Sequence, residues 1–141
     1  MNKCRSFIFD TALAPPAAGA ALKALQIIAA EPFRQQRLIE NQALLSRELE
    51  ARGLGQAKPS TPIFPVILGE GLTTMKVCEN LLIRGFYAQG IRPPAVPEGG
   101  ARLRITVSAA HHQNEIGKLG SALEGVLREL GMMKTTGTTN E

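Results

Sequence analysis

Two arginines separated by one residue, Arg102 and Arg104, are the best candidates in this sequence for binding an anion. They lie in the segment ARLRITVS, in which apolar and polar residues alternate as in a strand with one buried face. The alternation sends both guanidinium groups to one face, about 7 Å apart at a rise of about 3.3 Å per residue. A guanidinium fork can bind a carboxylate or a phosphate through two parallel hydrogen bonds. The pattern by itself favours arginines on a solvent-exposed sheet face, and an anion clamp is the functional alternative.

A loop rich in proline and glycine precedes this strand. Pro93, Pro94 and Pro97 each fix a backbone φ angle, and Gly99 and Gly100 permit a tight return of the chain. Such stiffness would serve a plain hairpin connection, and it would also steady a guanidinium group that binds a ligand.

Two other places invite a chemical interpretation. Adjacent histidines, His111 and His112, would point about 100° apart on a helix. No cysteine or carboxylate lies at a supporting spacing, so we predict no metal site. Thr11 follows an apolar run and could bind a phosphate, although a threonine in this position is more typical of a turn. The sequence contains no triad order, phosphate-binding glycine loop or carboxylate pair that would indicate a catalytic residue.

The composition is that of an ordinary globular domain. The 141 residues, 44% hydrophobic and 20% charged, suffice for one domain with a real core. The net charge of +4 is spread along the chain and only 4% of the residues are aromatic, which argues against nucleic-acid binding. No apolar run approaches the roughly 20 residues that span a bilayer, and no signal-peptide pattern is present. Cys4 and Cys78 fit no metal or redox spacing, so we predict a cytoplasmic protein with reduced thiols and no membrane association.

The rest of the sequence predicts the elements that must position the arginines. We expect helices over residues 17–30, 33–52, 73–84 and 112–130, and strands over residues 63–68, 86–91 and 102–108. The first helix should be largely buried, and Pro15-Pro16 before it should end an extended segment at residues 7–9. Pro65 places its strand at an edge or a bulge. The predicted fold class is α+β, a small and mainly antiparallel sheet covered by helices.

Three of the predicted helices show apolar residues at spacings of three and four, which indicates one buried face. These residues are Leu38, Leu45 and Leu49 in the second helix, Val77, Leu81 and Leu82 in the third, and Ile116, Leu119, Leu123, Leu127 and Leu130 in the last. The last helix also contains three glycines, so it needs tertiary packing to be stable.

Three segments together resemble the C-terminal portion of the 8-amino-7-oxononanoate synthases: FIFDTALAP, TPIFPVILG and IRPPAVPEGGARLRITVSAAH. These enzymes are α-oxoamine synthases, pyridoxal-phosphate enzymes of the aspartate-aminotransferase fold. The resemblance covers roughly residues 5–130 and is most specific in the order of RPPAVPEG and ARLRIT. It implies the C-terminal small domain of that fold, preceded by two linking helices.

The resemblance also implies an activity: decarboxylative condensation of L-alanine with pimeloyl-CoA or its carrier-protein thioester in biotin biosynthesis, with pyridoxal phosphate as cofactor. By this resemblance Arg104 would bind the carboxylate of the amino acid, and Arg92 would lie near the entrance for the acyl substrate. Thr11 would reach the cofactor phosphate of the partner subunit, because the site lies at a dimer interface. The resemblance therefore favours the anion clamp over the solvent-exposed face.

Two departures from the family pattern limit what the resemblance implies. Ala95 stands where the family usually has a threonine that contacts substrate, so the identity of the acyl substrate stays open. The Schiff-base lysine of the family lies upstream of FIFDTALAP, and none of the six lysines here has the corresponding context. We therefore expect no catalytic residue in this chain, no covalently bound cofactor and no activity of the chain alone.

We predict three parts in the chain: residues 1–53, which would join a large domain, residues 54–131, which form the small domain, and a flexible tail at residues 132–141. The expected partner is a second copy in a homodimer or a polypeptide that carries the large domain. One alternative is a non-catalytic binding or assembly module, since helices shaped for an absent domain would expose apolar surface. Another is part of a sibling α-oxoamine synthase of the glycine C-acetyltransferase type.

Overall fold

The structure is a computed structural model that describes residues 12–55 and 61–133. The chain divides into two compact units, Met1–Gln35 and Gln36–Glu141. The expected extended segment at residues 7–9 lies outside the described residues.

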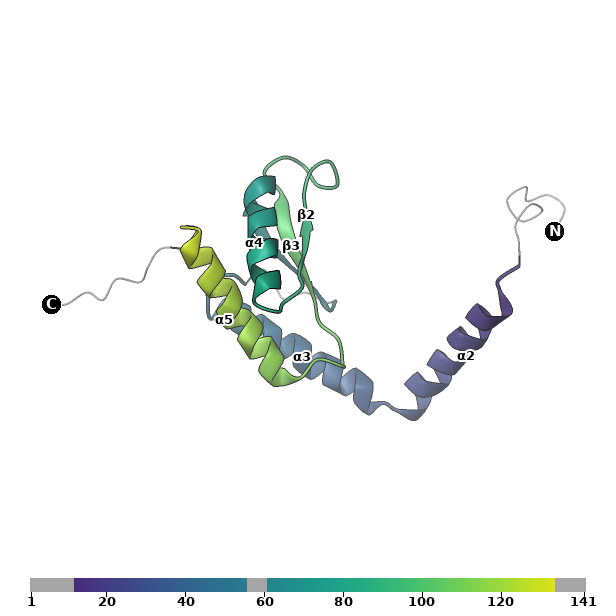
Figure 1. Cartoon of the computed structure of the whole chain (residues 1–141). Coiled ribbons are helices and arrows are strands. Elements are labelled where there is room, and N and C mark those ends of the chain that lie inside the picture. Colours follow the sequence, from purple (N-terminus) through teal and green to yellow (C-terminus); the bar gives the residue numbers. More distant parts are fainter. Residues whose placement is uncertain (1–11, 56–60, 134–141) are drawn as a thin grey trace. The chain divides into compact units, whose positions relative to one another are not determined.

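The first unit contains helix α2, Pro15–Ala30 (Figure 1). We expected Pro15 and Pro16 to end the preceding segment before the helix, but they are the first two residues of the helix. A proline in the first helical turn loses no hydrogen bond, because the N–H there has no partner within the helix. No residue of α2 is buried, and Leu22, Leu25 and Ile28 are 59%, 64% and 50% exposed. The prediction that this helix is largely buried is therefore wrong for this structure. The described residues of its unit offer α2 no sheet and no second complete helix to pack against.

The second unit is built on a three-stranded antiparallel sheet (Figure 1). Strand β3 (Ala101–Thr106) lies in the centre, between β1 (Ile63–Gly69) and β2 (Gln89–Ile91). The position of β1 at an edge agrees with Pro65, which has no N–H to donate to a second neighbouring strand. The positions of β1 and β3 and the antiparallel pairing agree with the predicted sheet.

Strand β3 alternates between a buried and an exposed face as predicted. Leu103, Ile105 and Val107 are at most 4% exposed, whereas Arg104 and Thr106 are exposed. The buried face of the sheet packs with three helices, α3 (Phe33–Glu50), α4 (Gly71–Ile83) and α5 (Gln113–Glu129). Helix α3 begins in the first unit, but its buried residues belong to the core of the second. The largest fully buried side chains are Leu45, Leu81, Leu103, Leu123, Leu127, Val77 and Val126.

Ion pairs join the helices around this core. Arg52, just after α3, pairs with Glu124 of α5 at 3.2 Å, and its Nη2 donates to the Ser121 hydroxyl. Arg84, at the end of α4, donates through Nη2 to both carboxylate oxygens of Glu129, each at 2.6 Å. The helices therefore contact one another through polar side chains at the rim as well as through the apolar core.

The predicted helix faces are confirmed with one exception. Leu45, Leu49, Val77 and Leu81 are at most 3% exposed, but Leu82 is 59% exposed. Leu82 lies about 100° around the helix axis from Leu81, and in α4 this places it outside the buried face formed by Thr74, Val77 and Leu81. In α5, the predicted residues are all buried or packed against the core.

Two helix starts differ slightly from the prediction. Helix α4 begins at Gly71, with Glu70 as its N-cap residue, and not at a threonine cap. The hydroxyl of Thr74 donates to the Glu70 carbonyl at 2.8 Å, so this threonine serves inside the first turn. Helix α5 begins at Gln113, after His112, whose backbone N–H donates to the Glu115 carboxylate at 2.8 Å. That contact is half of a capping box, which explains why the histidine pair lies at a helix start.

Residues 86–88, predicted as strand, leave the sheet before β2 begins. Helix α4 ends in a turn in which Gly85 has φ of +84° and the Phe86 N–H donates to the Leu81 carbonyl at 2.9 Å. Phe86 then packs against the core, which draws the chain away from the sheet plane. Strand β2 is therefore only three residues long and pairs with β3 only over residues 102–104.

The unit boundary after Gln35 reflects contacts within this chain, whereas the predicted division after residue 53 refers to a larger protein and stays a prediction. Met132 and Met133, the first residues of the predicted tail, are partly buried against the core. None of the helices in the described parts of the chain is long and apolar enough to cross a membrane.

Candidate functional site

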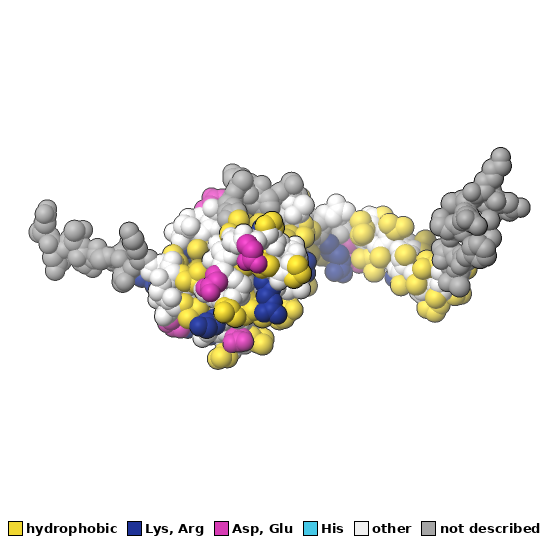
Figure 2. All heavy atoms as spheres, turned by 90° about the horizontal axis from the view of Figure 1, so that it is seen from above, with side chains coloured by type: hydrophobic (Ala, Val, Ile, Leu, Met, Phe, Trp, Pro, Cys, Tyr) yellow, Lys and Arg dark blue, Asp and Glu magenta, His cyan; other side chains and the backbone are white. Residues whose placement is uncertain are grey.

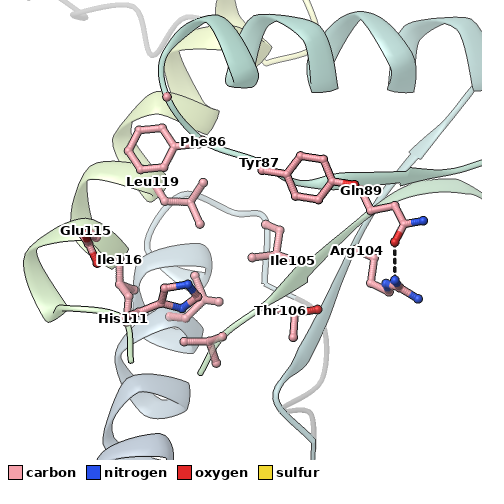
Figure 3. Close-up of a pocket in the computed structure, with 13 residues that line it drawn as sticks. Phe86, Tyr87, Gln89, Arg104, Ile105, Thr106, His111, Glu115, Ile116 and Leu119 are labelled. Carbon is pink, nitrogen blue, oxygen red and sulfur yellow. Dashed lines mark hydrogen bonds between the residues drawn. The ribbon is translucent and has the colours of Figure 1, made fainter. Parts of the chain in front are cut away.

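A cavity of about 440 Å³ opens in the second unit beside the central strand (Figure 3). Apolar side chains line one part of it, including Phe86, Ile105 and Leu119. Its polar lining comes from side chains of strands β2 and β3, of the turn before α5 and of the first turn of α5. These residues are Gln89, Arg104, Thr106, His111 and Glu115. The cavity thus combines an apolar wall with one cationic group.

The cavity exists because β2 covers β3 only in part. Gln89 is the first residue of β2 and lies opposite Arg104, so residues beyond Arg104 have no neighbour strand on that side. Residues 86–88 do not pair with β3, since Phe86 packs against the core and Ala88 is buried, and space is left beside Ile105 and Thr106. The short β2 strand, which the sequence pattern did not predict, is therefore the cause of the cavity.

The two arginines of β3 have different surroundings. Arg102 is half-buried, and its Nε donates to the carbonyl of Gly100 at 2.8 Å, which ties it to the preceding loop. Arg104 is exposed at the cavity, and its Nη2 donates to Oε1 of Gln89 (Figure 3). Only Arg104 therefore lines the cavity, and most of its N–H groups have no partner among the described residues.

The proline-rich loop forms the predicted tight connection. The Ala95 N–H donates to the Arg92 carbonyl and the Gly100 N–H to the Pro97 carbonyl, both at 3.0 Å, and the Pro93–Pro94 peptide bond is cis. Arg92 is exposed, and a Cβ on Gly71 would lie 3.5 Å from Arg92 Cβ, so its stem lies against the start of α4.

The structure does not bring all the predicted site residues into one cavity. Arg104 lines the cavity described above, and Arg92 does not. Thr11 lies outside the described residues, so its predicted contact with a cofactor phosphate stays a prediction.

A buried asparagine on α3 holds the turn that carries His111, one of the residues lining the cavity. Asn41 is fully buried, and its Nδ2 donates to the carbonyls of Ser108 and His111 at 2.9 and 3.0 Å. These bonds fix the turn between β3 and α5, in which the Ser108 N–H also donates to Nδ1 of His111 at 3.2 Å. Asn41 was missed from the sequence, although it lies three residues after Leu38 and four before Leu45 on the inward face. A polar residue in such a position signals a buried hydrogen-bonding role.

The lysines and the partly buried cysteine described in the second unit do not line the cavity. These lysines are Lys76 and Lys118. Burial raises the pKa of the Cys78 thiol, so this cysteine stays protonated near neutral pH and is not an activated nucleophile. Within residues 12–55 and 61–133, no three His, Cys, Asp or Glu side chains cluster to hold a metal ion. The chemistry that the cavity offers is therefore binding of a carboxylate or similar anion at Arg104.

Comparison with known proteins places this geometry in a family. Residues 2–123 match the family described as aminotransferase class I and II. The chain is 52% identical over 128 residues to a putative 8-amino-7-oxononanoate synthase of Desulforudis audaxviator, covering 88% of this chain and 33% of that protein. It is 41% identical over 127 residues to the 8-amino-7-oxononanoate synthase of Anaeromyxobacter dehalogenans, covering 90% of this chain and 32% of that protein.

A solved structure agrees with these relatives. Serine palmitoyltransferase from S. paucimobilis, with a bound PLP–myriocin aldimine, superimposes with a TM-score of 0.81 and 26% identity, over 92% of this chain and 33% of that one. The resemblance noted from the sequence and the predicted fold class are both confirmed. The chain spans about a third of the length of the curated relatives it matches. This chain belongs to the aminotransferase class I and II family.

Proposed function

We propose that this chain forms the C-terminal part of an 8-amino-7-oxononanoate synthase, which joins L-alanine to a pimeloyl thioester with loss of carbon dioxide. The names of its relatives support this reaction. The observation that carries the proposal is Arg104, a strand-mounted guanidinium at a cavity with an apolar wall, bonded to a neutral side chain.

The proposed role of Arg104 is to bind and orient the carboxylate of the amino acid. Its position on the central strand limits its movement more than a loop would. Because no acidic side chain pairs with it among the described residues, its charge is available to a ligand. The proposal further gives Arg92 a place near the entrance for the acyl substrate, and gives Thr11 a contact with the cofactor phosphate across a homodimer interface.

We also propose that the complete enzyme uses pyridoxal phosphate, as the bound group in the serine palmitoyltransferase structure supports. When bound, this cofactor supplies the electron sink that the condensation needs. The described residues do not form its site, because no lysine lines the cavity and Thr11 is not among them. Our proposal for this chain is therefore limited to binding the substrate.

A chimeric enzyme tests the proposed function. In it, this chain replaces the matching C-terminal third of the Desulforudis relative, and the unmodified relative serves as the control. We expect the chimeric enzyme, supplied with pyridoxal phosphate, to form 8-amino-7-oxononanoate from L-alanine and pimeloyl-CoA. A chimera that prefers glycine and acetyl-CoA would instead support a sibling synthase. One that forms no product while its parent is active would support the non-catalytic module.

The 141-residue chain alone offers a second test. We expect it to retain no pyridoxal phosphate after dialysis and to form no product, because none of its lysines has the context of the family's Schiff-base lysine. Retention of a cofactor absorbance band that disappears when one of its lysines is replaced would contradict this expectation.

A further inference from the structure

We infer that Gln89 is a positioning residue for Arg104: its neutral side chain holds the guanidinium group without offsetting the charge that binds the substrate carboxylate. The inference rests on the proposed function for its consequence in catalysis. The contact itself can be tested in the chain without any activity.

The strand register brings the two side chains together. Gln89 and Arg104 are directly opposite each other in the β2–β3 pair, and side chains of such pairs share one face of the sheet. Both residues are exposed, both line the cavity, and Arg104 Nη2 donates to Gln89 Oε1 (Figure 3). The contact is therefore at the mouth of the site, where a ligand would meet the guanidinium.

The backbone on each side of Gln89 is firmly packed. Ala88 is 6% exposed and belongs to the core. Gly90 lies so close to α4 that a Cβ there would be 2.9 Å from Cys78 Sγ and 3.2 Å from Met75 Sδ. These neighbours fix the backbone of the short strand against the helix, so the side chain of Gln89 projects from a fixed position.

The chemistry of the carboxamide explains why a glutamine suits this position. An arginine has five N–H donors, so one bond to Gln89 orients the planar group and leaves the others for a carboxylate. A glutamate in the same place would accept the same bond, but its charge would pair with Arg104 and compete with the substrate. Arg102 shows the contrast, since its bond to the Gly100 carbonyl ties it to the loop and away from the cavity.

Two substitutions of similar size distinguish the hydrogen bond that Gln89 accepts from the neutrality of its side chain. Gln89→Met removes the acceptor, and we expect it to raise the KM for L-alanine in the chimeric enzyme about threefold, because the guanidinium group loses the hydrogen bond that orients it. Gln89→Glu keeps the acceptor but adds the competing charge, and we expect it to raise this KM about tenfold. In both variants kcat and the KM for pimeloyl-CoA should stay within twofold, because only binding of the carboxylate weakens.

Gln35→Glu is the matched control for the added charge, since Gln35 is exposed and lines no part of the cavity. It should leave the KM for L-alanine unchanged. An active chimera in which neither Gln89 variant changes this KM more than the control overturns the inference and leaves the proposed function standing. Equal effects of the two Gln89 variants would refute the role of neutrality.

The 141-residue chain provides a readout that does not need activity. Rotation of the Arg104 guanidinium group, followed by NMR of its N–H groups, should be faster in Gln89→Met than in the unmodified chain and no faster in Gln89→Glu. If the chimera is inactive while its parent is active, the proposed function fails and this measurement alone decides whether Gln89 holds Arg104. Unchanged rotation in Gln89→Met would refute the contact.

Discussion

Helices α2 and α5 differ in how many of their residues are buried, and the more apolar helix is the one with none buried. The 16 residues of α2 are almost all apolar, yet none is buried, and hydrophobic side chains are prominent on the face of this helix seen in Figure 2. The 17 residues of α5 include three glycines and several charges, yet five positions are buried. A high apolar content thus indicates that a helix needs another surface to pack against. The periodic spacing of apolar residues indicates which face of the helix is buried. The same residue type can therefore have different roles in different surroundings.

The largest effect is expected from the leucines of these two helices. Leu123 of α5 is fully buried, whereas Leu25 of α2 is 64% exposed. Leu123→Ala should lower the free energy of unfolding by about 2–5 kcal/mol, because it leaves a cavity in the core. Leu25→Ala should change it by less than about 0.5 kcal/mol. Urea unfolding followed by circular dichroism measures both, and equal losses would show that α2 is packed in solution.

The two arginines of β3 extend the comparison to the site. Arg104→Lys in the chimeric enzyme should raise the KM for L-alanine about tenfold to a hundredfold, or about 1.5–3 kcal/mol, because a point charge replaces a two-pronged fork. Arg102→Lys is the matched control and should change this KM less than threefold, since Arg102 bonds to Gly100 and not at the cavity. Unchanged alanine kinetics in Arg104→Lys would instead support the alternative that Arg104 lies on a solvent-exposed sheet face and binds no ligand.

Two asparagines on helices provide the third comparison. Asn41 is fully buried and donates to two carbonyls, whereas Asn80 donates at the surface of α4 to the Lys76 carbonyl at 2.9 Å. Asn41→Leu should lower the free energy of unfolding by about 1–3 kcal/mol, because the carbonyls of Ser108 and His111 lose their partner. Asn80→Leu should cost less than about 0.5 kcal/mol. Thermal or urea unfolding distinguishes these outcomes, and similar losses would refute the structural role of Asn41.

The sequence pattern was sufficient to predict buried and exposed faces wherever these follow from the short repeat of a strand or a helix. Alternation along β3 predicted its buried and exposed faces, because successive side chains of a strand must point to opposite sides. Spacings of three and four predicted the inward residues of α3 and α5. The prediction for Leu82 was wrong because this residue lies about 100° around the helix axis from Leu81, outside the buried face of α4.

The parts that could not be predicted depend on contacts between distant segments. Gln89 reaches Arg104 only through the register of β2 on β3, and Asn41 meets Ser108 only when α3 packs beside the end of β3. The cavity forms because residues 86–88 are not part of the sheet. They leave it because Phe86 packs against the core. Apolar content could not reveal the exposure of α2, because it carries no information on which surface is present.

The smallest effect is expected from the thiol of Cys78, whose pKa burial raises above its ordinary value of 9.0. The folded chain keeps the thiol proton to a higher pH than the unfolded chain does. The contribution of this thiol to the free energy of unfolding is therefore fully present below pH 9. Its contribution is lost as the pH rises from about 9 through the higher pKa of the folded state. The free energy of unfolding should therefore fall more steeply over this range in the unmodified chain than in Cys78→Ala, in which other groups titrate unchanged. Urea titrations at pH 8, 9 and 10 measure the difference between the two slopes, and parallel curves would show that this thiol is as well solvated in the folded chain as in the unfolded one.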